Sequence, residues 1–168
     1  IADEVDALGH DWEGTSCKRC DAKRENPFVD VDEKVHKSFL DGILWAAEQG
    51  ITTGIDDTHF NPNGKCDRAT IVTFLWRAAG KPAPESTENP FVDIKTTDFF
   101  YDAVLWAYEK GITTGSDATH FNPYGKCNRA QVVTFLWRAE GKPGSTATES
   151  GFTDVTNPKE FYYDAVLW

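Results

Sequence analysis

The sequence lacks several features that define common protein classes. Among its 168 residues there is no methionine, and no apolar run approaches the roughly 20 residues that a membrane-spanning helix needs. Nothing at the start resembles a signal peptide, and the chain opens at Ile1. We therefore interpret it as a mature or excised fragment and expect no membrane insertion.

Motifs of catalytic chemistry are also missing. There is no Gly-x-Ser-x-Gly, no His-Glu-x-x-His and no phosphate-binding glycine loop. Carboxylate pairs occur only because acidic residues are abundant, with 27 Asp and Glu against 17 Lys and Arg. We therefore expect a protein that is not an enzyme.

The chain has no excess of positive charge. Its formal net charge is -10 and its pI about 4.8. Nucleic acid binding needs a positive field over a whole face, so nucleic acid is not an expected partner. One small anion can still bind locally, without help from long-range attraction.

What the sequence does contain is an internal repeat. Residues 43–82 align without gaps on 104–143, and 30 of those 40 positions are identical. A third copy opens at Gly151 and reaches Trp168, which matches Trp106. We divide the chain into an N-terminal segment, two repeats and the start of a third, at 1–25, 26–82, 89–143 and 151–168.

Each copy predicts a helix, a structured loop and a second helix. In the second copy Phe100, Ala103, Val104 and Ala107 form one apolar stripe, which predicts a helix over about 98–110. A helix pair of about 55 residues buries little apolar surface by itself, so the copies are expected to share one core.

The second helix of each copy is expected to begin after a good N-cap residue, Asp67 or Asn128. The loop before it should turn Phe60 or Phe121 inward. Trp76, on the apolar face of the second helix, and its equivalent in the second copy, Trp137, are expected in the core. For His59 and His120 in the loops we expect packing or a hydrogen bond.

The ordered motifs resemble the S-layer homology family. The first copy carries Phe28-Val-Asp-Val31, Gly50-Ile-Thr-Thr-Gly54, Phe60-Asn-Pro62 and Asp67-Arg-Ala-Thr70, and the second copy ends the set with Asn128-Arg-Ala-Gln131. The resemblance covers 26 to 168. It implies a mainly α fold in which repeated helix–loop–helix modules pack around a pseudo-threefold helical core, with the third module truncated at Trp168.

The resemblance also implies a function. Such modules are extracellular, non-catalytic anchors that hold surface proteins on Gram-positive-type cell walls by binding an anionic, often pyruvylated secondary polysaccharide in grooves between repeats. The arginine of the second-helix motif is a principal contact, which carries over to Arg68 and Arg129. Further glycan-binding candidates are the repeated aspartates and loop glycines: Asp30, Asp93, Asp154, Gly54 and Gly115.

An arginine at this position is chemically suited to an anion without the resemblance. It stands at the start of a helix, beside unpaired N–H groups and the positive end of the helix dipole. Because Asp67 adds a negative charge beside Arg68 whereas Asn128 is neutral, we predict that the site around Arg129 binds more tightly. The alternative is that both arginines form surface ion pairs.

The repeated aspartates also have two interpretations. In Phe-x-Asp they could accept sugar hydroxyls or orient the arginine, and alternatively they cap the segment that follows a turn.

Four cysteines are too few for a disulfide scaffold. Cys66 and Cys127 hold equivalent positions before the two N-caps and are expected to be small buried hydrophobic residues. An inter-repeat disulfide is the alternative, and it requires Cα atoms within about 7 Å.

The N-terminal segment resembles half a zinc ribbon. His10, Cys17 and Cys20 offer three ligands where zinc prefers four, and Asp11 or Asp21 is a poor fourth. A local disulfide and free thiols or disorder are the alternatives. We expect no other cofactor.

A second function remains open. Two copies and a fraction leave one position unfilled in a three-unit architecture, so the chain could be a structural assembly element that another chain completes. The face formed by Tyr162, Ala165 and Val166 would then support a homo-oligomer.

Overall fold

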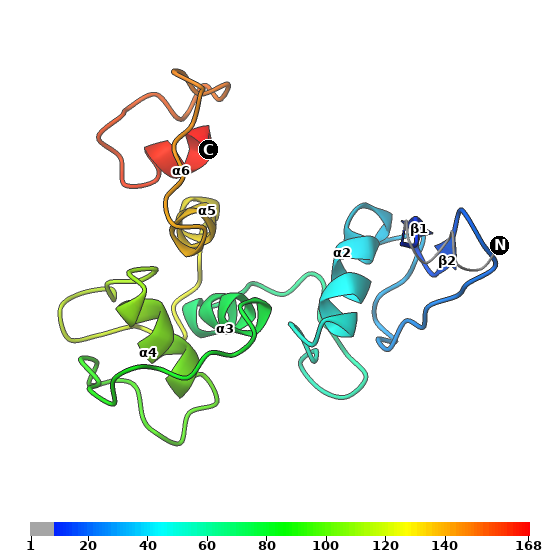
Figure 1. Cartoon of the computed structure of the whole chain (residues 1–168), viewed down its shortest axis with the longest axis horizontal. Coiled ribbons are helices and arrows are strands. Elements are labelled where there is room, and N and C mark those ends of the chain that lie inside the picture. The colour runs from blue at the N-terminus through cyan, green and yellow to red at the C-terminus, as the bar shows by residue number, and fades with distance from the viewer. Residues whose placement is uncertain (1–8) are drawn as a thin grey trace. The chain divides into compact units, whose positions relative to one another are not determined.

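The computed structural model describes residues 9–168, which form two compact units, one up to Gly64 and one from Lys65 to Trp168 (Figure 1). The described elements are mainly helical, as predicted, with one short hairpin that the sequence analysis did not anticipate. Their bounds are β1 Trp12–Glu13, β2 Ser16–Cys17, α2 Lys37–Glu48, α3 Arg68–Ala78, α4 Tyr101–Glu109, α5 Arg129–Ala139 and α6 Tyr163–Leu167. No helix in this part of the chain is long and apolar enough to cross a membrane.

The first unit packs the β1–β2 hairpin beside α2. Its core is a cluster of buried apolar side chains: Phe28, Val31, Leu40, Ile43 and Leu44. The hairpin is attached to α2 through Asp41, which accepts a hydrogen bond from the Gly14 amide (3.0 Å) and pairs with the buried Arg24. The guanidinium of Arg24 also lies 5.0 Å from the centre of the Trp12 ring.

The second helices begin where their caps predict. The Asp67 carboxylate accepts a hydrogen bond from the Thr70 amide (2.9 Å), so α3 starts at Arg68. Asn128 and Gln131 form a full capping box, each side chain bonded to the backbone N–H of the other. These local bonds are specified by residues three apart, which is why the sequence alone locates them.

In the second unit the helices pack across the boundaries of the sequence repeat. The second helix of one copy packs against the first helix of the next, α3 on α4 and α5 on α6 (Figure 1). The prediction of a shared core is therefore confirmed for α3 and α4: Ala69 and Val72 lie in one buried cluster with Val104, Trp106 and Ala107.

This offset explains the different environments of two equivalent tryptophans. Trp106 is only 7% exposed because α4 has a preceding second helix to pack against, whereas Trp45 on α2 is 53% exposed. The tryptophans of the second helices are half-buried, and their hydrogen bonds hold the chain segment that follows each helix. The indole N–H of Trp76 donates to Pro82 O (2.8 Å), and that of Trp137 to Pro143 O (2.9 Å).

The repeated aspartates fasten the loops. Asp93 accepts hydrogen bonds from the amides of Phe121 (2.9 Å) and Asn122 (2.8 Å), one on each carboxylate oxygen. In the first unit Asp30 makes the same two bonds to Phe60 and Asn61. The bonds hold each Phe ring turned inward, as predicted: Phe121 is fully buried, while Phe60 is half-buried against its unit's core.

Replacement of Asp93 by alanine should lower the free energy of unfolding by about 3 kcal/mol, because two hydrogen bonds to a charged acceptor are lost. Asp154 is the matched control, since it is exposed and no hydrogen bond or ion pair joins its side chain to the described residues. Asp154→Ala should change stability by less than about 0.5 kcal/mol. Urea denaturation monitored by tryptophan fluorescence measures both, and equal effects would contradict the loop-fastening role.

Candidate anion-binding site

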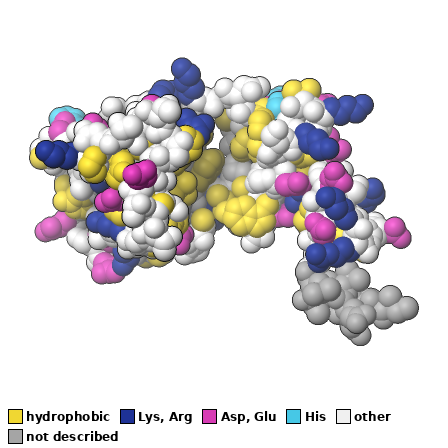
Figure 2. Space-filling model, turned by 90° about the horizontal axis from the view of Figure 1, so that it is seen from above, with side chains coloured by type: hydrophobic (Ala, Val, Ile, Leu, Met, Phe, Trp, Pro, Cys, Tyr) yellow, Lys and Arg dark blue, Asp and Glu magenta, His cyan; other side chains and the backbone are white. Residues whose placement is uncertain are grey.

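The second unit contains a pocket of about 460 Å³ to which all three copies contribute. Arg68 comes from the first copy, most of the wall from the second, and Phe161 from the third. The cationic side chains of the lining are Arg68, Lys126 and Arg138, and none of the lining residues is acidic. Figure 2 shows acidic and basic side chains interspersed over the visible face. The pocket lining differs from this face because its charged side chains are all basic.

Arg68 is the most constrained side chain of the pocket. It is 7% exposed, and its Nε donates to Phe121 O (2.8 Å) while Nη2 donates to Thr113 Oγ1 (3.3 Å). Its guanidinium carbon lies 4.8 Å from the ring centre of Phe121 and 5.3 Å from that of Phe135. The guanidinium is therefore fixed by the second copy, and three of its five N–H donors have no acceptor among the described residues.

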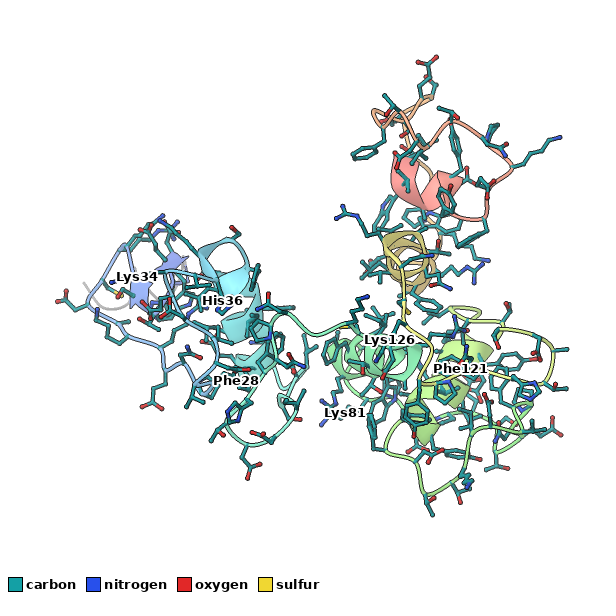
Figure 3. The ribbon with its side chains drawn as sticks, turned by 180° about the vertical axis from the view of Figure 1, so that it is seen from behind. Phe28, Lys34, His36, Lys81, Phe121 and Lys126 are labelled. Carbon is teal, nitrogen blue, oxygen red and sulfur yellow. The ribbon has the colours of Figure 1, made fainter. Side chains whose placement is uncertain are left out.

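No carboxylate of the described residues forms an ion pair with Arg68, although the nearby Asp93 acts on its charge from a distance. Burial lowers the pKa of the guanidinium, but an arginine still remains protonated. The nearest helix-cap acid, Asp67, is instead paired with Lys126 at 3.6 Å, and Figure 3 shows Lys126 beside α3. A half-desolvated cation without an ion-pair partner in the described chain favours an anionic ligand.

The helix N-terminus itself is not free to bind a ligand. The amides of Arg68 and Ala69 donate to Gly125 O (3.0 Å) and Pro123 O (2.9 Å) of the second copy, and Asp67 caps the Thr70 amide. The expectation that open amides at the helix start would hold the anion is therefore wrong for α3. Recognition in this pocket depends on side chains.

The second copy of the repeated Gly-Ile-Thr-Thr-Gly stretch, at 111–115, contributes Thr113, Thr114 and Gly115 to the pocket wall. Gly115 has φ +87°, and a Cβ there would lie 2.5 Å from Asp117 O and 2.7 Å from His120 O, so only glycine fits. Thr113 Oγ1 accepts the Gly115 amide (3.2 Å) as well as Arg68. The same residues thus shape the loop and position the cation.

The structure brings some of the predicted site residues together and separates others. Arg68 and Gly115 line the pocket, and Asp93 fastens the loop that receives Arg68. Asp30 and Gly54 belong to the equivalent loop of the first unit. Arg129 and Asp154 are exposed and do not line it.

Arg129 differs from Arg68 for a simple reason. Arg68 enters the loop of the following copy at Thr113 and Phe121, and the given sequence contains no matching residues for a third copy. The sequence analysis missed Lys126 and Arg138. Their recurrence, as Lys65 and Arg77 in the first copy, was the available signal.

The N-terminal candidates also lie together. One ligand atom each of His10, Cys17 and Cys20 falls within 4.8 Å of the others. Burial opposes ionisation of Cys17, but hydrogen bonds from the Arg19 amide and from His10 outweigh it and lower the pKa of this thiol to about 6. The group belongs to the first unit and is separate from the pocket.

These features describe a mainly helical module with a cationic pocket between its copies. The sequence model of the S-layer homology domain matches residues 27–71 and 90–133, more than half of the chain. The chain therefore belongs to the S-layer homology domain family, whose members are non-catalytic modules that anchor S-layer and other surface proteins to the cell wall.

Curated relatives agree with this assignment. The chain is 32% identical over 144 residues to an endoglucanase of a Bacillus species, covering 83% of this chain and 15% of the relative. It is 27% identical to a cell surface protein of Thermoanaerobacter kivui (68% and 15%) and 27% identical to an S-layer protein of Bacillus anthracis (56% and 11%). The chain thus spans about 15% or less of these relatives, and it is a cell-surface module.

Acid should loosen the loops beside each Gly-Ile-Thr-Thr-Gly stretch. Hydrogen bonds from the Thr119 amide and His120 lower the pKa of Asp117 to about 2, and Thr58 and His59 do the same for Asp56. Because both folded-state pKa values lie below the unfolded value of about 3.9, the stabilisation is complete above pH 4 and is lost as the pH falls towards 2.

The double variant Asp56→Asn, Asp117→Asn should therefore show a shallower loss of stability between pH 4 and pH 2 than the unmodified chain. Denaturant midpoints measured across this range test it, with Asp154→Asn as the control. An unchanged slope in the double variant would show that other carboxylates govern the acid transition.

Proposed function

We propose that the chain anchors its parent protein by binding an anionic, pyruvylated secondary cell-wall polysaccharide in the pocket around Arg68. The observation that carries this proposal is the pocket lining, which gathers Arg68, Lys126 and Arg138 with no carboxylate, in a chain of net charge -10. No catalytic role is assigned to the chain.

The chemistry of a pyruvate ketal fits this lining. Its carboxylate would accept the free N–H donors of Arg68, and a guanidinium binds a carboxylate through two parallel hydrogen bonds. Lys126 and Arg138 add charge around it. The exposed ring of Phe161 supplies an apolar face on which a sugar ring can stack.

The proposal reverses the ranking expected from the sequence. Arg68 ranks above Arg129 because its guanidinium is already oriented by Phe121 and Thr113 and loses little conformational freedom on binding. Arg129 is exposed and without a described partner for its side chain, so it would have to be ordered by the ligand.

We also assign the modules to a pseudo-threefold arrangement. The offset packing of α3 on α4 and of α5 on α6 would close on itself if the second helix of a complete third copy packed on α2. The exposed Trp45 on α2 supports this, because its equivalent Trp106 is buried where a preceding second helix is present.

Replacing Arg68 should abolish most of the binding. Arg68→Ala and Arg68→Lys should each weaken binding of a purified pyruvylated wall polymer by about 10- to 100-fold, since one bidentate charged contact contributes about 1.5–3 kcal/mol. Lys126→Ala should weaken it less. Arg129→Ala is the matched control and should stay within about twofold. Isothermal titration calorimetry at fixed ionic strength measures all four.

Sacculi provide the second test. The chain should sediment with purified wall sacculi and remain in solution after the secondary polymer, and with it the ketal, has been removed chemically. Undiminished binding to stripped sacculi would redirect the function to peptidoglycan or protein partners. Because Arg68 also contacts the core, thermal melts of Arg68→Lys must match the unmodified chain before its affinity is interpreted.

The alternative is an assembly element completed by a second chain. The face of Tyr162, Ala165 and Val166 does not support it, because Ala165 is buried and the other two side chains are half-buried where α6 packs on α5. The exposed apolar side chains Phe39 and Trp45 on α2 favour it instead. Light scattering distinguishes the two, because an assembly element forms oligomers at micromolar concentration whereas the anchor described above can act as a monomer.

A further inference from the structure

The first unit gathers three metal-ligating side chains away from the anion pocket. The β1–β2 pairing places Trp12 opposite Cys17, which brings His10, just before β1, next to the Cys17-x-x-Cys20 turn. His10 Nδ1 lies 3.5 Å from Cys20 Sγ, and the three ligand atoms all fall within 4.8 Å of one another. Around a tetrahedral zinc ion, sulfur ligands are about 3.8 Å apart, so the three ligand atoms would have to approach one another by only about 1 Å.

Backbone hydrogen bonds help to hold this arrangement. The Arg19 amide donates to Cys17 Sγ (3.3 Å), an interaction that orients a thiolate towards a shared ion. The Lys18 amide donates to Asp11 O (2.8 Å) and the Cys17 amide to Ala22 O (3.1 Å), which fix both ends of the turn. The His10 ring is held against Trp12, with centroids 4.7 Å apart.

We propose that His10, Cys17 and Cys20 bind one zinc ion, with water or another external donor as the fourth ligand. Two sulfur ligands and an imidazole suit zinc better than calcium or magnesium, which prefer oxygen. Among the described residues no fourth His, Cys, Asp or Glu joins the group. His10 is exposed and Cys20 half-buried, so one side of the site is open to solvent.

The ion would stabilise the attachment of the hairpin to the first repeat. Gly14 and Thr15, in the turn between β1 and β2, bond to Asp41 (3.0 Å) and Glu33 (2.7 Å) respectively. Zinc would therefore link the two strand ends of the hairpin, while the turn of the hairpin is already bonded to the first repeat. This role is independent of glycan binding.

Cobalt and zinc titrations of the reduced, metal-free full chain test the site. Cobalt should produce a thiolate-to-cobalt charge-transfer band and tetrahedral ligand-field bands at one equivalent per chain, and zinc should remove them. His10→Gln and Cys20→Ser should weaken binding at least tenfold. The double variant Cys66→Ser, Cys127→Ser is the control and should bind as the unmodified chain does.

Three outcomes overturn the zinc proposal. The reduced unmodified chain gives no charge-transfer band, or His10→Gln and Cys20→Ser both bind as tightly as before, or the Cys66 and Cys127 control loses the band. The first outcome needs no variant, so it stays decisive even if a substitution unfolds the hairpin.

The other two cysteines lie on neighbouring segments of two copies. Cys66 is exposed and Cys127 half-buried, so the prediction of a small buried hydrophobic residue is wrong for Cys66. Asp67 and Lys126 form an isolated antiparallel bridge, flanked by hydrogen bonds from Cys127 N to Cys66 O (3.1 Å) and from Arg68 N to Gly125 O (3.0 Å). Cys66 and Cys127 are therefore opposite residues with side chains on the same face. Opposite Cα atoms in antiparallel pairs lie about 4.5–5.5 Å apart, inside the range of roughly 4.4–6.8 Å found for disulfides.

We infer that Cys66 and Cys127 form a reversible disulfide that joins the first two copies beside Arg68. An external disulfide, protein or low-molecular-weight, is the oxidant. The thiolate of the exposed Cys66 attacks it and expels one thiol, and the thiolate of Cys127 then attacks Cys66 Sγ in the mixed disulfide and expels the second. Two protons leave and the oxidant gains two electrons. Burial raises the pKa of both thiols, so the exchange should accelerate above neutral pH.

Peptide mapping after oxidation tests this second inference. The chain with Cys17→Ser and Cys20→Ser should be treated with oxidised glutathione and cleaved by trypsin without reduction. A cross-linked pair of the tripeptides 66–68 and 127–129 is expected, with a melting temperature several degrees above that of the reduced chain. Only intermolecular links, only glutathione adducts, or no link at all would overturn it.

Discussion

The second unit depends on one interaction, the entry of Arg68 into the loop of the following copy. The guanidinium is held by a backbone carbonyl, a threonine hydroxyl and two aromatic rings, all from residues more than forty positions further along the chain. The amides at the start of α3 are satisfied by the same copy. Helix start, cation and loop are therefore specified together, and the pocket exists only where two copies meet.

The sequence was sufficient for most features that are specified locally, although it did not reveal the short β1–β2 hairpin. The caps Asp67 and Asn128 and the hydrogen bonds of His59 to Asp56 and of His120 to Asp117 all follow from residues three positions apart. The repeat was also detectable from the sequence, because 30 of the 40 aligned positions are identical in the two copies.

Features set by contacts between copies were not predictable in the same way. Arg129 and Arg68 hold equivalent positions in two copies, yet one is exposed and the other buried, because Arg68 enters the loop of the following copy and the given sequence does not include the corresponding loop for Arg129. Lys126 and Arg138 look like ordinary surface cations until Arg68 of the preceding copy joins them in the lining of one pocket. The proximity of Cys66 to Cys127 likewise depends on a single long-range bridge.

The offset packing has a consequence for how such chains can change in length. Since the pocket combines Arg68 of one copy, the wall of the next and Phe161 of the third, only duplication of a whole copy supplies all the elements of a further pocket together. An insertion or loss of part of a copy would instead break two interfaces at once. Gene duplication in units of one repeat is therefore the change of length that this architecture tolerates best, because it preserves the pairing of each second helix with the first helix of the following copy.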